Sequence, residues 1–244
     1  MRTPFRTLRG LTLGVLCGLT VGVCPQTPSV LAAPVPAATW QKPVEQKIVE
    51  ENRRVKIHVR YPQFGVDKID RDIRQWALGI AGEFRSEYGG EALSDTHMPY
   101  LLDITYEVVA PPKGMLSVIW QEASYTAGAH GQLNLLSLNY APETGEPVAL
   151  LDVFESPSMA LRIMSAHAEK VLSRRLADMK VDDMLREGLL PEADNFATFA
   201  ITPAGLRVYF PPYQVAPWAA GPQSVDIPLE ILKPAGPRLR YWGK

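Results

Sequence analysis

The chain has 244 residues, of which 46% are hydrophobic and 21% are charged, with 2 cysteines and a formal net charge of -1. These proportions are those of a globular protein, and they exclude a disordered, collagen-like or disulfide-rich chain. The nearly neutral charge also removes the electrostatic argument for nucleic-acid binding, because phosphate recognition needs a concentrated basic surface. No nucleic-acid partner is therefore expected.

The N-terminal segment 1–32 has the layout of a secretory signal peptide. Three arginines among the first nine residues precede an uncharged apolar run over 11–23, and a small-residue cleavage pattern follows around Ala32. This run is shorter than the roughly 20 residues that a helix needs to cross a bilayer. We therefore expect an extracytoplasmic protein, periplasmic or secreted, without a membrane span after cleavage.

Both cysteines, Cys17 and Cys24, lie within this leader. A lipid anchor at Cys24 is not expected, because Val23 stands where a lipidation signal usually has a small residue. Removal of residues 1–32 takes away three arginines and no acid, which leaves 25 - 3 = 22 basic against 26 acidic residues. The mature chain is then slightly acidic and has no disulfide, cysteine nucleophile or thiolate metal site.

The first elements expected after the leader are a flexible linker over 33–44, a strand and a helix. Apolar residues alternate with charged ones from Val55 to Tyr61, which predicts a half-buried strand. Helical spacing of apolar residues then predicts a helix over 67–87, with Asp67 as its cap. We group residues 45–98 as an N-terminal strand-helix part.

A β-hairpin is predicted next. Alternating apolar residues over 102–108 and 116–120 flank a Pro-Pro-Lys-Gly turn at 111–114. A further strand is predicted over 133–140, and a turn follows at 142–145. These elements begin a C-terminal part that we expect to cover residues 99–232, followed by a tail over 233–244.

A second long helix is predicted over 157–179, where Ser156 can cap the helix and Pro157 fits its first turn. The elements predicted after it are a short helix over 182–187 and strands over 196–201, 206–210 and 225–229. Strands interrupted by two long helices, without a regular strand-helix repeat, predict an α+β fold. We expect mostly antiparallel sheets with the two main helices packed on them.

The segment Tyr125–Gly131, with the sequence Tyr-Thr-Ala-Gly-Ala-His-Gly, is the first candidate site. Gly128 and Gly131 flank His130, so that the backbone can approach a ligand and the imidazole can be exposed. The alternative is a tight connection between strands in which His130 satisfies backbone groups.

The second candidate is the proline-rich loop at 209–221. Its prolines cannot continue a central strand and fix an extended loop. Such a loop can present Tyr213 and Trp218 as rigid contacts to a partner or to a sugar face. The alternative, that the rings fold back onto the core, is at least as favoured for Tyr209 and Phe210 and equally open for Trp218.

No motif predicts catalysis, a cofactor or a metal site. The sequence has no Gly-x-Ser-x-Gly elbow, phosphate loop or dinucleotide fingerprint, and its 4 histidines never pair on one helical face. The alternative function is a hydrolase of envelope polymer in which His130 is the acid-base group. This alternative requires a carboxylate within hydrogen-bond reach of His130. The candidate carboxylates are Glu122, Asp152 and Asp226.

The order of these segments resembles the family of domains of unknown function numbered 3298 (DUF3298). Tyr125–Gly131 is followed by an Asn-Tyr-x-x-x-Thr-Gly turn at 139–145, by Leu151, Asp152 and Phe154 before the second helix, and by the aromatic and proline segment 205–221. Tyr61, Pro62 and Gln63 in the N-terminal part are similar to the companion family DUF4163. Two departures are Ala127, where the family has glycine, and Trp218, where it more often has tyrosine.

This resemblance implies an extracytoplasmic α+β module, like the part of the anti-sigma factor RsiV that binds lysozyme and the accessory region of the peptidoglycan deacetylase PdaC. It implies a binding module of the cell envelope without catalytic activity or cofactor. The ligand is expected to be a partner protein, such as a lysozyme-like one, or peptidoglycan. The expected binding residues are Tyr125, Gly128, His130, Gly131, Tyr213 and Trp218.

Overall fold

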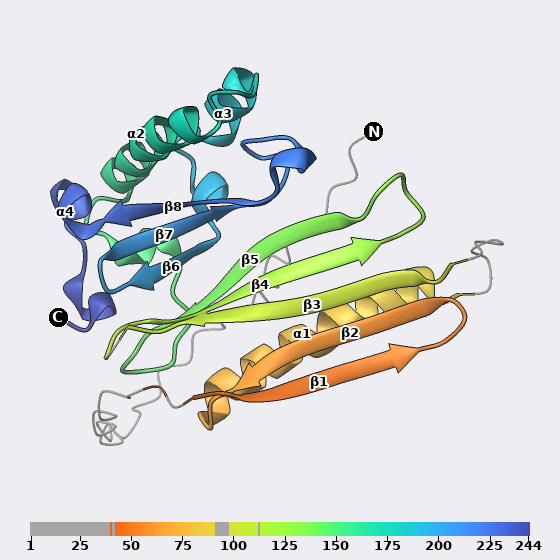
Figure 1. Ribbon diagram of the computed structural model, residues 1–244. Helices are drawn as coiled ribbons and strands as arrows, with labels where there is room; N and C mark the ends of the chain where they lie inside the picture. The colour runs from red at the N-terminus through yellow and green to blue at the C-terminus, as the bar shows by residue number, and fades with distance from the viewer. Residues whose placement is uncertain (1–39, 41, 91–97, 112) are drawn as a thin grey trace, which may run out of the picture. The chain divides into compact units, whose positions relative to one another are not determined.

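The computed structural model describes residues 40, 42–90, 98–111 and 113–244. The predicted signal peptide with its two cysteines lies outside these residues, as does His97. The described part contains a five-stranded sheet, a three-stranded sheet and two long helices (Figure 1). The predicted α+β fold is confirmed.

The five-stranded sheet lies in sequence order and combines antiparallel with parallel pairing (Figure 1). Its strands are β1 (Val44–Glu51), β2 (Val55–Gln63), β3 (Tyr100–Val109), β4 (Leu116–Tyr125) and β5 (Gln132–Tyr140). Only β2 and β3 pair in parallel, because the helix α1 (Asp67–Tyr88) crosses between them. The other pairs are antiparallel, and the predicted hairpin is the pair β3–β4.

Helix α1 covers one face of this sheet and matches the predicted span at both ends within one residue. Its N-cap is Val66 rather than the predicted Asp67, which is the first residue of the helix. Asp70 fixes the start of the helix, because its two carboxylate oxygens accept hydrogen bonds from the backbone N–H groups of Phe64 (2.7 Å) and Gly65 (2.8 Å). The buried face of α1 consists of Ile69, Ile73, Ala77, Ala81 and Phe84.

Strand β1 was not predicted. It is an edge strand that pairs with β2 in the register Val44↔Gln63 to Glu51↔Lys56. The side chains of its inner face are only half-buried, and two of these three residues, Gln46 and Glu50, are polar. The strand therefore lacks the apolar alternation that a sequence prediction needs, and backbone pairing supplies its stability.

The three-stranded sheet consists of β6 (Phe199–Thr202), β7 (Gly205–Phe210) and β8 (Gln223–Pro228), all antiparallel. The predicted strand 196–201 was placed too early, because residues Ala193–Phe196 form a 3-10 helix. Strand β8 begins two residues before the predicted position.

Helix α2 (Pro157–Arg175) packs on this second sheet (Figure 1). It ends four residues before the predicted Met179, because the chain turns at Leu176, whose carbonyl accepts the N–H of Met179 (2.8 Å). Ser156 occupies the N-cap but its side chain makes no capping hydrogen bond, whereas Pro157 lies in the first turn as predicted. The short helix α3 (Asp182–Gly188) follows.

The segment 233–244, expected as a tail, contributes to the core of this half. It follows the short helix α4 (Leu229–Leu232). Tyr241 and Trp242 are 4% and 3% exposed. The indole Nε1 of Trp242 donates to the carbonyl of Gly205 in β7 (3.0 Å).

The two sheets are connected by hydrogen bonds between β5 and the start of β6. The hydroxyl of Thr198 donates to the carbonyl of Leu135 (3.0 Å), and the hydroxyl of Ser137 donates to the carbonyl of Ala197 (3.2 Å). The backbone N–H of Phe199 donates to the Ser137 hydroxyl (3.1 Å). These bonds fix the relation of β5 to β6, and thereby bring sequence-distant loops together.

Candidate functional site

The first candidate segment forms the connection between β4 and β5. Ala127 has a left-handed backbone conformation (φ 60°), which is unusual for a residue with a side chain. His130 is exposed, and its Nδ1 lies 2.7 Å from the carbonyl oxygen of Gly131. Because a carbonyl oxygen only accepts, Nδ1 carries the proton in this contact.

The second candidate segment connects β7 to β8 and contains a tight turn at residues 213–216. Tyr213 has a positive φ of 70° and is 52% exposed, while the following Val215 and Ala216 are buried. The backbone N–H of Tyr213 donates to the carbonyl of Ala216 (2.8 Å). Such a conformation in an aromatic residue persists only where its surroundings hold it in place.

The side chain of Gln214 holds this turn against the rest of the molecule. Its Nε2 donates to the carbonyls of Gly188 at the end of α3 (3.0 Å) and of Asn195 (2.9 Å). The amide therefore uses both donors on backbone acceptors of two other segments. The neighbouring Tyr213 side chain is positioned by the rigid backbone that results.

His130, Tyr213 and Trp218 together form one cluster, here called the aromatic surface. The His130 and Trp218 rings stack with centroids 4.9 Å apart and planes at 23°. The His130–Tyr213 and Tyr213–Trp218 centroid distances are both 6.2 Å. The Tyr213 hydroxyl lies 3.2 Å from His130 Nε2, to which it can donate. The two loops that carry these rings lie at the same end of their sheets (Figure 1).

The structure brings these three predicted residues together, and their side chains are exposed or half-buried. Tyr125 instead ends β4, where it pairs with Leu101 of β3. Gly131 stands close to the chain, since a Cβ there would lie 3.2 Å from the carbonyl oxygen of Ser124. Gly128 has more room. Phe210 is fully buried in the core, and Tyr209 is half-buried.

The carboxylates considered as partners of His130 interact with other groups. Asp226 forms a two-pronged ion pair with Arg207 (2.6 and 2.9 Å), and Asp152 accepts the N–H of Ala149 (3.1 Å). Burial raises the pKa of Glu122, whose side chain is hydrogen-bonded to Asn134. In the part of the chain that the structure describes, none of the three carboxylates is hydrogen-bonded to His130. The acid-base pair of a hydrolase is therefore not formed by these residues.

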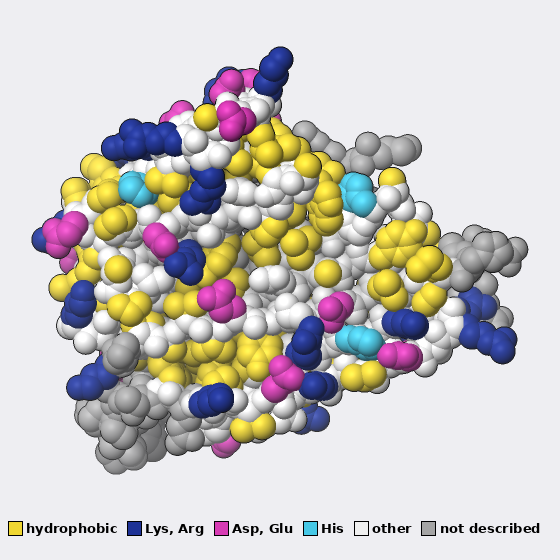
Figure 2. Space-filling model, in the orientation of Figure 1, with side chains coloured by type: hydrophobic (Ala, Val, Ile, Leu, Met, Phe, Trp, Pro, Cys, Tyr) yellow, Lys and Arg dark blue, Asp and Glu magenta, His cyan; other side chains and the backbone are white. Residues whose placement is uncertain are grey.

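Residues 40, 42–90, 98–111 and 113–244 contain no group of three or more histidine, cysteine, aspartate or glutamate side chains arranged to hold a metal ion. None of the helices within those ranges combines the length and apolar character of a membrane span. On the face drawn in Figure 2, basic and acidic side chains are interspersed, with hydrophobic ones between them.

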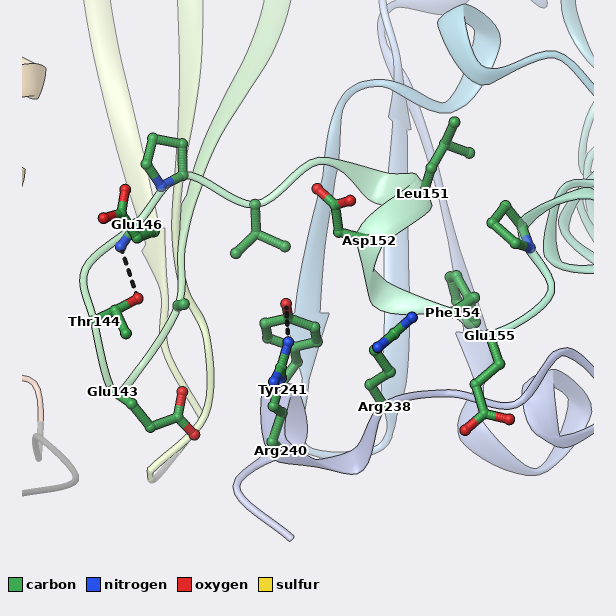
Figure 3. Close-up of a pocket in the computed structure, with 14 residues that line it drawn as sticks. Glu143, Thr144, Glu146, Leu151, Asp152, Phe154, Glu155, Arg238, Arg240 and Tyr241 are labelled. Atoms are coloured by element: carbon green, nitrogen blue, oxygen red, sulfur yellow. Dashed lines mark hydrogen bonds between the residues drawn. The ribbon is translucent and has the colours of Figure 1, made fainter. Parts of the chain in front are cut away.

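A cavity of about 460 Å³ lies away from the sequence-predicted rings, none of which lines it. Its walls come from the segment after β5 and from the C-terminal segment (Figure 3). Its charged lining residues are Glu143, Glu146, Asp152, Glu155, Arg238 and Arg240. Sequence reasoning missed the two arginines, because no pattern links residues 238 and 240 to the Thr144–Phe154 segment.

Comparison with known proteins assigns part of the chain to a family. Residues 151–230 match the family model described as "Protein of unknown function (DUF3298)". These residues are a DUF3298 region. The resemblance to that family is confirmed, whereas the DUF4163-like character of residues 45–98 stays a prediction.

Curated relatives extend the match beyond the DUF3298 region. The chain is 29% identical over 187 residues to the peptidoglycan-N-acetylmuramic acid deacetylase PdaC of Bacillus subtilis, covering 76% of this chain and 40% of PdaC. It is 26% identical over 153 residues to the immunogenic protein MPT64 of Mycobacterium tuberculosis, covering 61% of this chain and 66% of MPT64. The chain thus spans less than two thirds of the length of these relatives.

Solved structures share the fold of this chain. A DUF3298 family protein from Pseudomonas aeruginosa superposes with a TM-score of 0.63 at 13% identity, covering 85% of this chain and 99% of that one. A second family member, from Bacteroides fragilis, has a TM-score of 0.52 at 15% identity, with 78% and 92% coverage. At these identities the likeness shows the fold alone.

Proposed function

We propose that this DUF3298 chain is a binding module of the cell envelope without catalytic activity, which recognises its ligand through the aromatic surface. The observation that carries this proposal is the convergence of His130 with Tyr213 and Trp218 from loops 83 residues apart. Rings that serve only the core would be buried, whereas Tyr213 is 52% exposed.

The aromatic surface is suited to binding because it is rigid before any ligand arrives. Tyr213 and Trp218 are residue types that dominate the energetics of interfaces, and both lose little conformational entropy on binding. The Gln214 hydrogen bonds and the stacked imidazole hold the rings in place. Ligand binding therefore costs little side-chain entropy. A flat sugar face or a protein surface can stack on such a cluster.

The envelope setting is supported by the predicted signal peptide and by the relative PdaC, which is named as a peptidoglycan deacetylase. Within that setting, the ligand is a partner protein or peptidoglycan itself. A basic, lysozyme-like protein is one candidate, although the small net charge of the mature chain gives only weak electrostatic steering toward it.

Retention of the purified protein on peptidoglycan and on immobilised lysozyme tests the proposal and separates the two ligands. Trp218→Ala is expected to weaken retention at least tenfold, as for a central interface residue. His130→Ala is expected to weaken retention as well, and His58→Ala is its matched control, because the exposed His58 lies on β2 and is hydrogen-bonded to Glu51 on the neighbouring strand. Retention on neither material, or equal retention of the Trp218→Ala variant with its unfolding midpoint unchanged, would count against the aromatic surface.

A further inference from the structure

A cavity of about 580 Å³ is lined by the start of α1 and by the strands β1 and β2, and it shares no residue with the aromatic surface. Small-molecule sites usually have volumes of roughly 300–1,000 Å³. We call this space the Arg74 cavity. The side chains that determine its chemistry are Gln46 of β1, Tyr61 and Gln63 of β2, and Arg71, Arg74 and Gln75 of α1.

Arg71 and Arg74 lie on the flank of α1 that faces β1. They follow one another at helical spacing beside the buried stripe of the helix. On the opposite flank, Trp76 packs against Trp120 of β4, with ring centroids 4.1 Å apart. Because β4 lies on one side of α1, the flank that carries the two arginines is directed toward the other side of the sheet, where β1 is its edge strand.

A third arginine on this flank shows how far such side chains reach. Arg85 lies about three helical turns after Arg74, and its Nε donates to a carboxylate oxygen of Glu50 on β1 (2.5 Å). Glu50 and Gln46 are on the same face of β1, because side chains alternate along a strand. Arg71 and Arg74 therefore face the inner side of β1 near Gln46, where the strand presents a neutral amide instead of an acid.

The basic residues of α1 outside the cavity form ion pairs, whereas those that line it do not. Lys68 pairs with Glu146, and Arg85 pairs with the acid on β1. Within the part of the chain that the structure describes, Arg71 and Arg74 form no ion pair and no side-chain hydrogen bond. The charge of two guanidinium groups is thus presented to the cavity.

The two acidic residues of the cavity do not neutralise these arginines. Asp70 stands four residues before Arg74, a spacing that favours an ion pair on a helix. Both of its carboxylate oxygens instead accept backbone N–H groups just before α1. Asp67, four residues before Arg71, is exposed and forms no ion pair within the described ranges. A ligand can therefore supply the missing acceptor.

The neutral side chains of the cavity are suited to a ring that carries hydroxyl groups. Each amide of Gln46, Gln63 and Gln75 can both donate and accept a hydrogen bond, as a hydroxyl group can. Tyr61 lies directly opposite Gln46 in the strand register and is half-buried, so that it offers an apolar ring with a polar tip. These groups match the alternating apolar and polar surface of a sugar.

We propose that the Arg74 cavity binds a sugar that carries a carboxylate group, the chemistry of a uronic acid or of a muramic acid. Arg71 and Arg74 bind the carboxylate, because the planar guanidinium matches its geometry and stays charged. The glutamine amides and Tyr61 bind the sugar ring. This inference does not depend on the aromatic surface, which shares no residue with the cavity.

Nuclear magnetic resonance titration of the purified protein with matched pairs of sugars tests the assignment. D-Glucuronic acid has a carboxylate where D-glucose has a hydroxymethyl group, and N-acetylmuramic acid adds a lactyl carboxylate to N-acetylglucosamine. At least one acid should shift the backbone amides over 61–78 and bind roughly threefold or more tightly than its neutral counterpart. The acid that binds more tightly identifies the source of the group. N-Acetylglutamate, which has carboxylates but no sugar ring, should bind more weakly than that acid.

Substitutions test which side chains bind the acid. Arg71→Gln and Arg74→Gln should each weaken its binding roughly three- to tenfold, between the values of an exposed ion pair and of a charge-assisted hydrogen bond, and should leave the neutral sugar unaffected. Arg162→Gln, at an exposed position of α2, is the matched control. Gln63→Ala should weaken the binding of acid and neutral sugar alike. Trp218→Ala should change neither, so that failure of this proposal is distinguishable from failure of the aromatic surface.

Three results would overturn the proposal. The first is that neither acid binds, or that each acid binds no more tightly than its neutral counterpart. The second is that N-acetylglutamate binds as tightly as the sugar acid, which would show that the cavity recognises a carboxylate without a sugar. The third is unchanged binding of the acid in both arginine variants.

Discussion

Gly188 and Gln214 are packed backbone against backbone, so that a Cβ atom on Gly188 would overlap the carbonyl oxygen of Gln214. The same two residues are joined by a hydrogen bond from Gln214 Nε2 to the Gly188 carbonyl (3.0 Å). The end of α3 therefore supports the turn that carries Tyr213. This support links the stability of α3 to the geometry of the aromatic surface.

Gly188→Ala should consequently destabilise the protein by roughly 2–4 kcal/mol, the upper part of the range for single substitutions, because one of two backbones must shift. It should also weaken ligand retention by the aromatic surface. Denaturant unfolding measures the first effect. The control is Gly79→Ala in α1, where a Cβ meets nothing within 4 Å; this change should stabilise the helix by about 0.5–1 kcal/mol. Equal effects of the two substitutions would contradict the proposed support.

Ala127 adopts a backbone conformation that glycine adopts without strain. Ala127→Gly is therefore expected to raise the free energy of unfolding by up to about 1 kcal/mol, since about 1–2 kcal/mol of strain is relieved against a smaller entropic cost. Ala123→Gly, at an exposed position within β4, should instead lower it by about 0.5–1 kcal/mol. Thermal unfolding of both variants shows whether the change in the free energy of unfolding has opposite signs at the two sites.

Burial raises the pKa of Tyr209 to about 12, and the negative charge of Glu107 acts in the same direction. An unfolded tyrosine loses its proton near pH 10, so above that pH the folded protein holds one proton more than the unfolded chain. The contribution of Tyr209 to stability is then fully present below about pH 10 and is lost as the pH rises toward 12, at up to roughly 1.4 kcal/mol per pH unit. We expect the free energy of unfolding, measured with urea at several pH values between 9 and 12, to fall less steeply with pH in Tyr209→Phe than in the unchanged protein. Parallel curves for the two proteins would refute this.

Local patterns predicted those elements that bury one face formed by residues close together in the sequence. The apolar stripe of α1 and the alternation in β3 and β4 gave spans close to those observed, because one face of each is buried. Strand β1 escaped prediction because its stability comes from pairing with β2. Helix α2 ends early for a similarly non-local reason, since the buried Leu176 and Val181 draw the chain back toward the core.

The candidate sites were predictable to a different extent. Glycine and proline patterns marked the loops of His130 and Trp218, but their stacking depends on how β5 meets β6 and on Gln214, which no local pattern includes. Asn139 and Asp152 stood out as motif residues.

The parallel pairing of β2 with β3 affects how the five-stranded sheet assembles. The hairpin β1–β2 and the meander β3–β4–β5 can each form from near neighbours in the chain, whereas the parallel seam requires that α1 first closes a long loop. The docking of these two preformed pieces is therefore expected to be the slow step of folding in this half. Its rate should depend on how readily α1 forms in the unfolded chain.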